Sequence, residues 1–312
     1  SPAAMVASVL VVGGTHGNEC NAPWLLQQWG PSFAALQRPR LKVQTALGNP
    51  RALQCCRRYI DRDLNRSFRG DLLQAQPSPA DQWEVQRARE LVQSFGPQGT
   101  KPCQVVIDLH STTAAMGNSL VVYGRRPADL ALAAACQERL GLPIYQHEHD
   151  PDQTGFMAEA WPCGLVLEVG PVPQGVISPV ICQQTQLGLE TLLDLLDEAS
   201  QGPIQIRSPL RVHRHSGSLD LPRDSSGQPT ACLHPARLKS DWTPLKPGAP
   251  LFQQGDGTVI PFSGEPDQVT VFSNEAAYQE KHIATSLARR VSIPCDPSWS
   301  RALSDLLQGV DR

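Results

Sequence analysis

A histidine and a carboxylate stand three residues apart near the start of the chain, in the segment Gly13-Gly14-Thr15-His16-Gly17-Asn18-Glu19. A metal ion is the chemistry that this pair suggests first, because a catalytic zinc commonly takes three ligands from histidine and carboxylate side chains and leaves a fourth position for water. The spacing alone is weak support, since an isolated His-x-x-Glu often occurs by chance on a solvated surface. A third ligand has to come from elsewhere in the chain.

The residues around this pair predict a strand, a turn and a helix. Ser8–Val12 is a short apolar run with the β-branched character of a buried strand, and the paired glycines after it end the strand. Asn21–Trp29 is predicted to form a helix with Pro23 in its first turn, where the missing N–H costs nothing. His16 is therefore expected on a turn and Glu19 near the helix entrance, so that the two side chains can converge.

The best candidate for the third ligand is His110, at the end of the apolar run 104–110, which predicts another buried strand. Strand ends are where sites are built in α/β sheets. Asp108 would share the face of His110 and could orient its imidazole from behind. Glu168 follows a further apolar run, Gly164–Leu167, where a carboxylate is costly unless it is used or paired. It could serve as the base that takes a proton from water and returns it to a leaving group.

Six segments carry a resemblance to a known family: 13–19 (GGTHGNE), 48–51 (GNPR), 58–66 (RYIDRDLNR), 108–113 (DLHSTT), 168–171 (EVGP) and 274–278 (NEAAY). In this order they resemble the aspartoacylase/aminoacylase-3 family, which consists of zinc amidohydrolases related to the metallocarboxypeptidases. The matches extend over nearly the whole chain. The resemblance implies one zinc ion per chain held by His16, Glu19 and His110, with Glu168 as the general acid/base.

The resemblance also implies how a substrate is held. Arg58 would polarise the scissile carbonyl, Asn65 and Arg66 would bind the α-carboxylate, and Tyr278 would contact the substrate from late in the chain. Arginine suits these tasks because its planar fork matches a carboxylate or a developing oxyanion. Without the resemblance, the charged stretch 54–69 would be interpreted as a surface loop with ordinary salt bridges.

One position departs from the family pattern. The arginine that aspartoacylases carry ten residues before the general base, where it binds the second carboxylate of N-acetylaspartate, falls on Ala158. Other residues that could supply the positive charge are Arg125, Arg126, Lys281, His147 and His149. The predicted reaction is hydrolysis of N-acetylaspartate to acetate and aspartate. The alternative is aminoacylase-3-like deacylation of N-acetyl aromatic amino acids, for which Phe156, Met157 and Trp161 would suit the pocket.

Three other functions remain open at this point. A metallocarboxypeptidase would use the same ligands, but a capping domain that carries Tyr278 favours a small, enclosed substrate over a peptide. A desuccinylase would need a longer acyl pocket. A catalytically inactive metabolite-binding protein could use the same fold, although it would have no need of Glu168.

Composition is that of an ordinary soluble globular protein. The chain has 312 residues, of which 40% are hydrophobic, so it can bury one large core or a core plus a smaller domain. A net charge of −3 without a Lys/Arg run argues against nucleic acid or anionic membranes as partners. No apolar run is long enough to span a membrane and no signal-peptide layout is visible, so a cytoplasmic location is expected. A small-molecule substrate is the expected partner, with a homo-oligomer possible.

Two domains are expected. Residues 1–202 alternate apolar runs with helical stretches, which predicts an α/β domain with a mixed sheet flanked by helices, of the zinc carboxypeptidase-like type that the resemblance implies. Residues 203–312 predict a smaller β-rich capping domain with a C-terminal tail, 293–312, that includes a helix over 298–310 without an assigned role. The histidines in this domain are expected to be structural or exposed and without a suitable companion: His213, His215 and His234. The nine cysteines are expected to be free thiols.

Overall fold

The computed structural model describes residues 6–239 and 241–309. Its main element is a sheet of ten strands in the order β2-β1-β3-β6-β4-β5-β7-β13-β12-β9. The first four run parallel to one another, and β4, β5 and β7 run in the opposite direction. The predicted mixed sheet is therefore confirmed. The strands are β1 (Ala7–Gly13), β2 (Leu41–Leu47), β3 (Val105–Ser111), β4 (Gly117–Tyr123), β5 (Ile144–His147), β6 (Cys163–Gly170), β7 (Leu210–Leu219), β9 (Thr243–Leu245), β12 (Gln268–Val271) and β13 (Thr285–Ile293).

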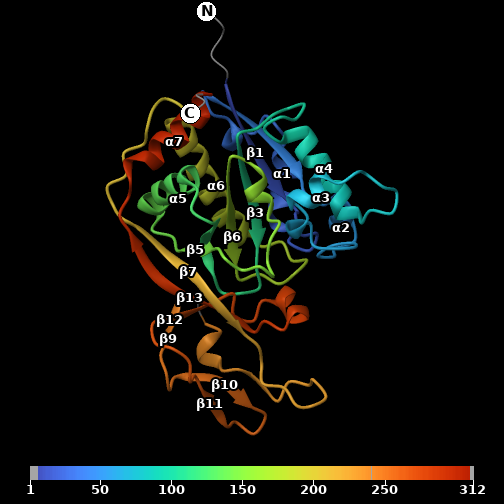
Figure 1. Cartoon of the computed structure of the whole chain (residues 1–312), viewed down its shortest axis with the longest axis vertical. Coiled ribbons are helices and arrows are strands. Elements are labelled where there is room, and N and C mark those ends of the chain that lie inside the picture. Colours follow the sequence, from blue (N-terminus) through green and yellow to red (C-terminus); the bar gives the residue numbers. More distant parts are fainter. Residues whose placement is uncertain (1–5, 240, 310–312) are drawn as a thin grey trace, which may run out of the picture.

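Helices cover both faces of the parallel part of this sheet, as Figure 1 shows. One face carries α1, α5, α6 and α7, whose apolar side chains share a core with the strands. The opposite face carries α4. The helices are α1 (Asn21–Trp29), α2 (Pro50–Gln54), α3 (Gly70–Gln74), α4 (Trp83–Phe95), α5 (Pro127–Leu140), α6 (Pro179–Ala199) and α7 (Pro297–Gln308).

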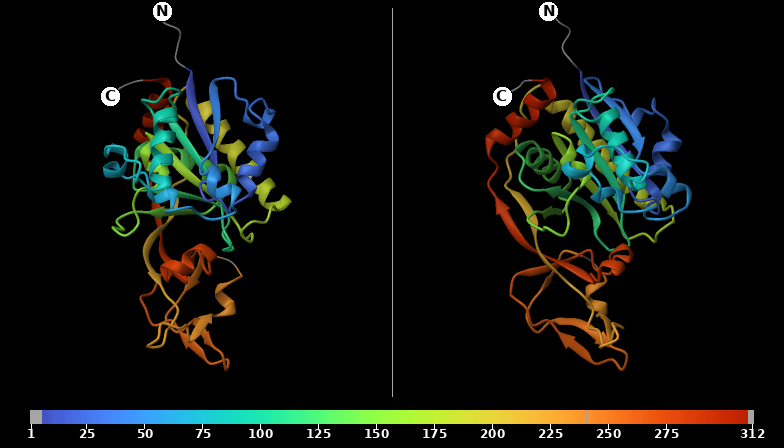
Figure 2. Two further views of the ribbon diagram at one scale, coloured as in Figure 1. Left: turned by 90° about the vertical axis from the view of Figure 1, so that its right-hand side faces the viewer. Right: turned by 45° about the vertical axis from the view of Figure 1, so that its right-hand side comes forward.

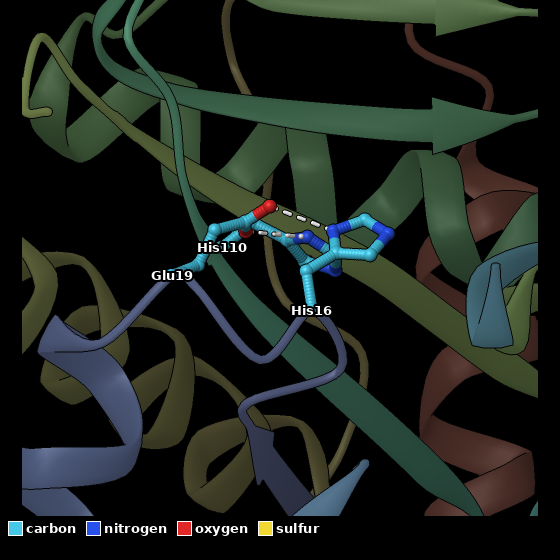
Figure 3. A group of neighbouring side chains, drawn as sticks. All are labelled: His16, Glu19 and His110. Carbon is cyan, nitrogen blue, oxygen red and sulfur yellow. Dashed lines mark hydrogen bonds and ion pairs between the residues drawn. The ribbon is translucent and has the colours of Figure 1, made fainter. Parts of the chain in front are cut away.

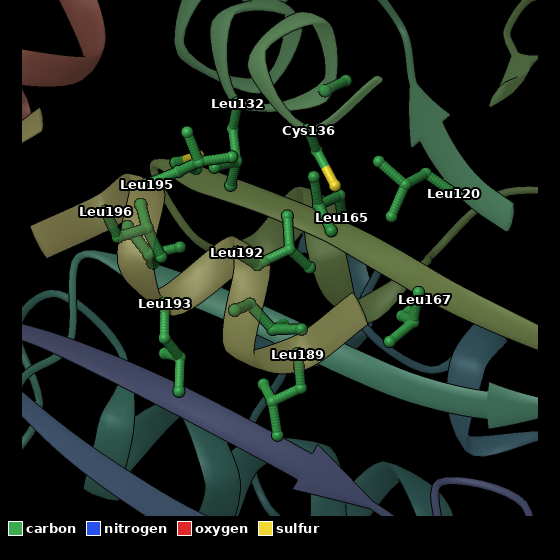
Figure 4. Close-up of a cluster of buried hydrophobic side chains, with 14 of the residues drawn as sticks. Leu120, Leu132, Cys136, Leu165, Leu167, Leu189, Leu192, Leu193, Leu195 and Leu196 are labelled. Atoms are coloured by element: carbon green, nitrogen blue, oxygen red, sulfur yellow. The ribbon is translucent and has the colours of Figure 1, made fainter. Parts of the chain in front are cut away.

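The apolar run of β1 shows why these layers form. Val9 and Val11 point to the face covered by α1 and α6, whereas Leu10 and Val12 point to the face covered by α4. Because successive strand residues face opposite sides, a strand buried on both faces is a continuous apolar run rather than an alternating one. Figure 4 shows the larger core, where leucines of α6 gather with side chains of α5 and of strands β4 and β6.

A smaller β-rich part extends from one end of the sheet (Figure 2). The long antiparallel strands β7 and β13 lead to it, and it contains a three-stranded sheet of β8 (Ala231–Leu233), β10 (Pro250–Gln254) and β11 (Val259–Pro261). A small apolar cluster of its own includes Leu233, Leu251 and Phe252. The β7 and β13 strands continue the main sheet, so the domain division at 202/203 stays a prediction.

The C-terminal helix α7 returns to the large core. Leu303 and Leu307 are buried against the core that α5 and α6 form. The expected helix 298–310 is thus present, with Val310 outside the described residues. Among the described residues the nine cysteines are free, as expected, and no helix has both the length and the apolar character to span a membrane.

Candidate active site

Three predicted ligands converge at the carboxyl ends of β1 and β3. His16 Nδ1 lies 2.7 Å from Glu19 Oε2, and His110 Nδ1 lies 3.0 Å from Glu19 Oε1. Figure 3 shows the two imidazoles next to each other, each facing one oxygen of the carboxylate. Both histidines are buried, and each of the three residues offers one ligand atom within 4.8 Å of the others. This donor set is the kind that binds zinc in proteins.

A second carboxylate stands behind each imidazole. His16 Nε2 lies 2.8 Å from Asp63 Oδ1, and His110 Nε2 lies 2.6 Å from Asp108 Oδ2. Metal-ligating histidines typically bond their other ring nitrogen to a carboxylate, which fixes the tautomer and leaves the lone pair facing the metal. Both Nδ1 atoms are therefore free to face an ion next to Glu19. The predicted role of Asp108 agrees with its position. No role was predicted for Asp63, although it lies inside the segment 58–66 that carries the resemblance.

Charges in this cluster stabilise one another against the cost of burial. Burial alone would raise the pKa of Glu19 and Asp63, but the neighbouring imidazoles, and Arg58 beside Asp63, hold both pKa values below the usual range. Burial alone would lower the pKa of His110, but Asp108 and Glu19 raise it well above 6.5. Without an ion, a proton on the His110 imidazole therefore provides positive charge next to Glu19.

Glu168 lies directly opposite His110 in the pairing of β3 with β6 and lines the same pocket. Its side chain forms no hydrogen bond with another described residue. Burial, opposed by His110 and reinforced by Glu19 and Glu275, raises the pKa of Glu168 well above 4.5. A carboxyl group with a raised pKa beside a reacting centre suits proton transfer in both directions.

Arg58 bridges the carboxylates of the cluster. Its guanidinium lies 3.4 Å from Glu19 Oε2 through Nη1 and 3.3 Å from Asp63 Oδ2 through Nη2. The loop that carries it is anchored by Glu84 of α4, which is fully buried. The Glu84 carboxylate accepts hydrogen bonds from the backbone N–H groups of residues 60, 61 and 62, at 2.8–3.0 Å. A loop that sequence alone suggests is solvated is therefore fixed in place.

Asn65 and Arg66 follow in a short 3₁₀ helix, Leu64–Arg66, whose first N–H groups are capped by Asp63. Asn65 Oδ1 accepts a hydrogen bond of 2.8 Å from the Met157 N–H. The Arg66 guanidinium lies over the Phe156 ring, 4.2 Å from its centroid, and donates to Gln153 Oε1 at 3.0 Å. Both predicted carboxylate-binding residues thus line the pocket, with Arg66 held between an aromatic ring and an amide.

Tyr278 comes from the short helix Ala276–Lys281 and completes the pocket wall, as expected of a residue that caps the site. Glu275, just before this helix, is buried and accepts a 2.7 Å hydrogen bond from the Thr113 N–H as well as a short one from the Thr112 hydroxyl. These two residues follow β3 and its ligand His110. Glu275 therefore joins the late segment to the centre of the site.

One wall of the pocket is markedly aromatic. Tyr123 stacks on Phe156 with ring centroids 4.0 Å apart. The other side chains of this wall are Val121, Tyr145, His147, Val166, Phe272 and Tyr278. Arg58 and Arg66 are the arginines among the described lining residues, and no lysine is among them. Phe156 fits the prediction of an apolar pocket, whereas Met157 and Trp161 are buried in the core under α4 instead.

The residues that could replace the missing arginine lie elsewhere or are uncharged. Arg126 is turned away from the pocket and donates to the Ala158 carbonyl oxygen at 2.8 Å. Arg125 pairs with Glu148, and His149 is 84% exposed. Lys281 lines a neighbouring depression. Burial, helped by His215 and Arg66, lowers the pKa of His147 to about 4, so this imidazole is neutral at pH 7.

The prediction that the late histidines have no suitable companion was wrong for His215. It lies on β7 beside His147 and Asp150, and the three form a second cluster of potential metal ligands. Sequence reasoning missed it because the partners are about 65 residues away and meet only through the pairing of β5 with β7. Glu84 and Glu275 were missed for the same reason, although the sequence offers a weak signal in Glu275, which is inside the segment 274–278.

The mixed α/β sheet thus carries a buried His/Glu/His cluster that could hold a metal ion, with the Glu168 carboxyl group in the same pocket. Comparison with known proteins identifies the family. Residues 5–196 match the family described as succinylglutamate desuccinylase/aspartoacylase catalytic domain, and residues 208–290 match the AstE/AspA barrel-sandwich hybrid domain. The chain belongs to the aspartoacylase/succinylglutamate desuccinylase family.

Individual relatives agree with this placement. A protein of Prochlorococcus marinus (strain MIT 9313) named probable aspartoacylase is 54% identical over 299 residues, which cover 96% of this chain and 98% of that protein. A probable aspartoacylase of Synechococcus sp. (strain CC9605) is 53% identical, with coverage of 96% and 97%. The crystal structure of murine aminoacylase 3 is similar with a TM-score of 0.83 at 34% identity, covering 93% of this chain and 97% of that one.

Proposed function

We propose that this protein hydrolyses the amide bond of N-acyl amino acids with one zinc ion held by His16, Glu19 and His110. The single observation that carries the proposal is the joint geometry of these ligands. Two imidazoles face one carboxylate through Nδ1, and each is fixed from behind by a second carboxylate, at 2.8 Å and 2.6 Å. The names of the relatives support the same reaction.

The donor set fits zinc in number and type, since three nitrogen and oxygen ligands leave one position free. A zinc ion there would act as a Lewis acid toward a carbonyl and would lower the pKa of water. Other proteins use such sites for hydrolysis of amides. The short distances between the His16, His110 and Glu19 ligand atoms indicate that the three side chains can reach a common centre with little movement.

The protein's own residues supply the proton transfers and the orientation. Glu168 takes a proton from the attacking water and later delivers it to the nitrogen of the leaving amine, for which its raised pKa is suited. Arg58 donates hydrogen bonds to the oxyanion that develops on the carbonyl oxygen when water attacks the carbonyl carbon. Asn65 and Arg66 bind the α-carboxylate, and the aromatic wall with Tyr278 receives the amino-acid side chain.

Two substrates are supported by different observations. N-acetylaspartate is supported by the relatives named probable aspartoacylase. N-acetyl aromatic amino acids are supported by the lining of the pocket, where aromatic rings take up one wall and His147 is neutral. A second substrate carboxylate without a cationic partner would be strongly penalised. On the geometry of the pocket, the aromatic substrate is therefore the better fit.

Amine release from N-acetylaspartate and N-acetylphenylalanine by the purified, zinc-loaded protein tests this proposal. Glu168→Gln serves as the matched control, because it keeps the size of the side chain and removes its capacity to act as a base. We expect kcat/KM to be higher for the aromatic compound and turnover to be lost in the control. A higher kcat/KM for N-acetylaspartate would assign the other substrate.

If the wild type hydrolyses neither compound faster than the Glu168→Gln control, the proposed reaction is wrong for both compounds. Turnover that persists after dialysis against a chelator, and that does not increase when zinc is added, would contradict the role of the metal.

A further inference from the structure

We propose that His147, Asp150 and His215 form a second site for a divalent transition-metal ion, separate from the His16 cluster. The three residues lie within 4.8 Å of one another through one ligand atom each. Two imidazoles and one carboxylate are nitrogen and oxygen donors of the kind that zinc prefers. Neither the proposed reaction nor the relatives' names assigns them a role.

The layout of this second cluster repeats that of the first. In the first, a carboxylate follows a histidine by three residues (His16, Glu19), and the other histidine comes from the adjacent parallel strand. In the second, Asp150 follows His147 by three residues after strand β5. The third member, His215, lies on the parallel neighbour β7, one step beyond the paired residues Gln146 and Arg214. The same local geometry therefore places the same donor types together twice.

Distances between the donor atoms suit an ion at the centre. His215 Nε2 lies 3.5 Å and His147 Nε2 lies 3.9 Å from Asp150 Oδ2. Zinc–ligand bonds of about 2.0–2.2 Å place the ligand atoms of a tetrahedral site roughly 3.4 Å apart. The observed distances are near this value and beyond the usual length of a hydrogen bond. The donor atoms of the two histidines lie within 4.8 Å of each other, so they have to approach one another when an ion binds.

His147 supplies an independent reason to expect a ligand here. Its side chain is 9% exposed, and its Nε2 atom is buried without a hydrogen-bond partner. A buried polar atom without a partner is costly, and native proteins seldom leave one in place. This atom is the one that points to Asp150, so an ion between the two would satisfy it.

His215 is oriented as a ligating histidine should be. Its Nδ1 atom forms a short hydrogen bond with the Tyr145 hydroxyl, while Nε2 faces Asp150. A partner on one ring nitrogen fixes the tautomer and leaves the other as the donor to the metal. Tyr145 thus has the position behind His215 that Asp63 has behind His16. Of the neighbouring acids, Glu148 is paired with Arg125 and Arg214, which leaves Asp150 as the carboxylate ligand.

An ion at this site would tie the loop after β5 to strand β7. This loop carries Gln153, which accepts the hydrogen bond from Arg66, and Phe156, which packs under the same guanidinium. Because His147 also lines the substrate pocket, the ion would fix the wall of that pocket and bring positive charge to it. Its expected effect on hydrolysis is a change in KM rather than in kcat.

Metal content per chain tests the proposal directly, with Co²⁺ and Zn²⁺ as the probes. The full-length protein is dialysed to equilibrium against each ion and its metal content is measured by mass spectrometry, with the visible spectrum of bound Co²⁺ as a second readout. Asp150→Asn is the decisive variant because it keeps the Oδ1 acceptor for the Asp152 N–H. His149→Asn is the matched control: this exposed neighbour has a φ of 58°, which Asn tolerates.

We expect two ions per chain in the wild type and in the His149→Asn control, and one in Asp150→Asn and in His215→Gln. Glu19→Ala should bind one ion, and Glu19→Ala combined with Asp150→Asn none. Circular dichroism of each variant verifies that the chain is folded. One ion in the wild type that is lost in Glu19→Ala, or two ions kept in both Asp150→Asn and His215→Gln, would overturn the second site without affecting the proposed catalytic one.

Discussion

Asp63 offers the sharpest test of how the metal cluster is built, because it touches the cluster without being one of the proposed ligands. Its carboxylate accepts from His16 Nε2 at 2.8 Å, from the Asn65 N–H at 2.8 Å and from Arg58 Nη2 at 3.3 Å. The pKa of Asp63 is held well below 3.8, against the effect of burial, by His16 and Arg58. The side chain is therefore ionised at neutral pH. Asp63→Asn removes this charge and keeps an acceptor oxygen for the backbone.

The expected loss of zinc affinity follows from what a carboxylate behind a ligating histidine contributes to metal binding. Loss of a carboxylate behind a ligating histidine typically weakens metal binding about 10- to 100-fold, which is about 1.4–2.7 kcal/mol. A charged hydrogen bond contributes about 1.5–3 kcal/mol and a neutral one about 1, so a loss of about 1–2 kcal/mol is expected for an amide at this position. We therefore predict zinc affinity roughly 10- to 30-fold below that of the parent.

The assay is competition for Zn²⁺ with a chromophoric chelator, carried out in the Asp150→Asn background so that the His16 cluster alone is measured. Asp61→Asn is the matched control: it makes the same charge change in the same loop, but Asp61 is exposed and accepts from the Trp83 N–H instead. An affinity for Asp63→Asn within about threefold of this control would refute the reasoning. An equal loss in both variants would assign the effect to the charge of the loop.

Three further predictions concern other parts of the molecule. Arg58→Ala should lower kcat about 10²- to 10³-fold and keep its zinc, whereas loss of metal would refute its role toward the oxyanion. Glu275→Gln should raise KM and lower the melting temperature, because it weakens the bond to Thr113. An unchanged KM would contradict the role of Glu275 in holding the late segment at the site. Burial, together with Arg290, lowers the pKa of His213 to about 4 from 6.5. Since the unfolded chain then binds more protons, stability should fall as pH drops from 6.5 toward 4, at up to ~1.4 kcal/mol per pH unit. Denaturant titrations of His213→Gln should show that its free energy of unfolding depends less on pH than that of the parent.

The sequence was sufficient for those parts of the site that depend on short-range order. His16 and Glu19 are joined by a glycine turn after an apolar strand, and His110 ends another such strand, so their meeting follows from the parallel pairing of β1 with β3. Glu84 could not be assigned, because it belongs to an amphipathic helix in which a glutamate usually faces water. Glu84 is buried because the loop 58–66 packs against it, and the sequence does not show where this loop lies. Similarly, the partnership of His147 and His215 depends on strand register across 68 residues, which no local pattern specifies.

The site combines residues from both ends of the chain, and this explains why the fold needs its long connecting strands. His110 and Glu168 lie on the parallel strands and the other two ligands on the turn after β1, but the pocket is closed by Tyr278, which comes after the β-rich part. Strands β7 and β13 are paired over most of their length, so they hold the segment between them at a fixed position relative to the sheet. Glu275 then bonds to the residues that follow His110. The capping segment is therefore fixed at two points, by strand pairing and by a buried carboxylate, and a pocket wall held in this way can select a substrate by shape.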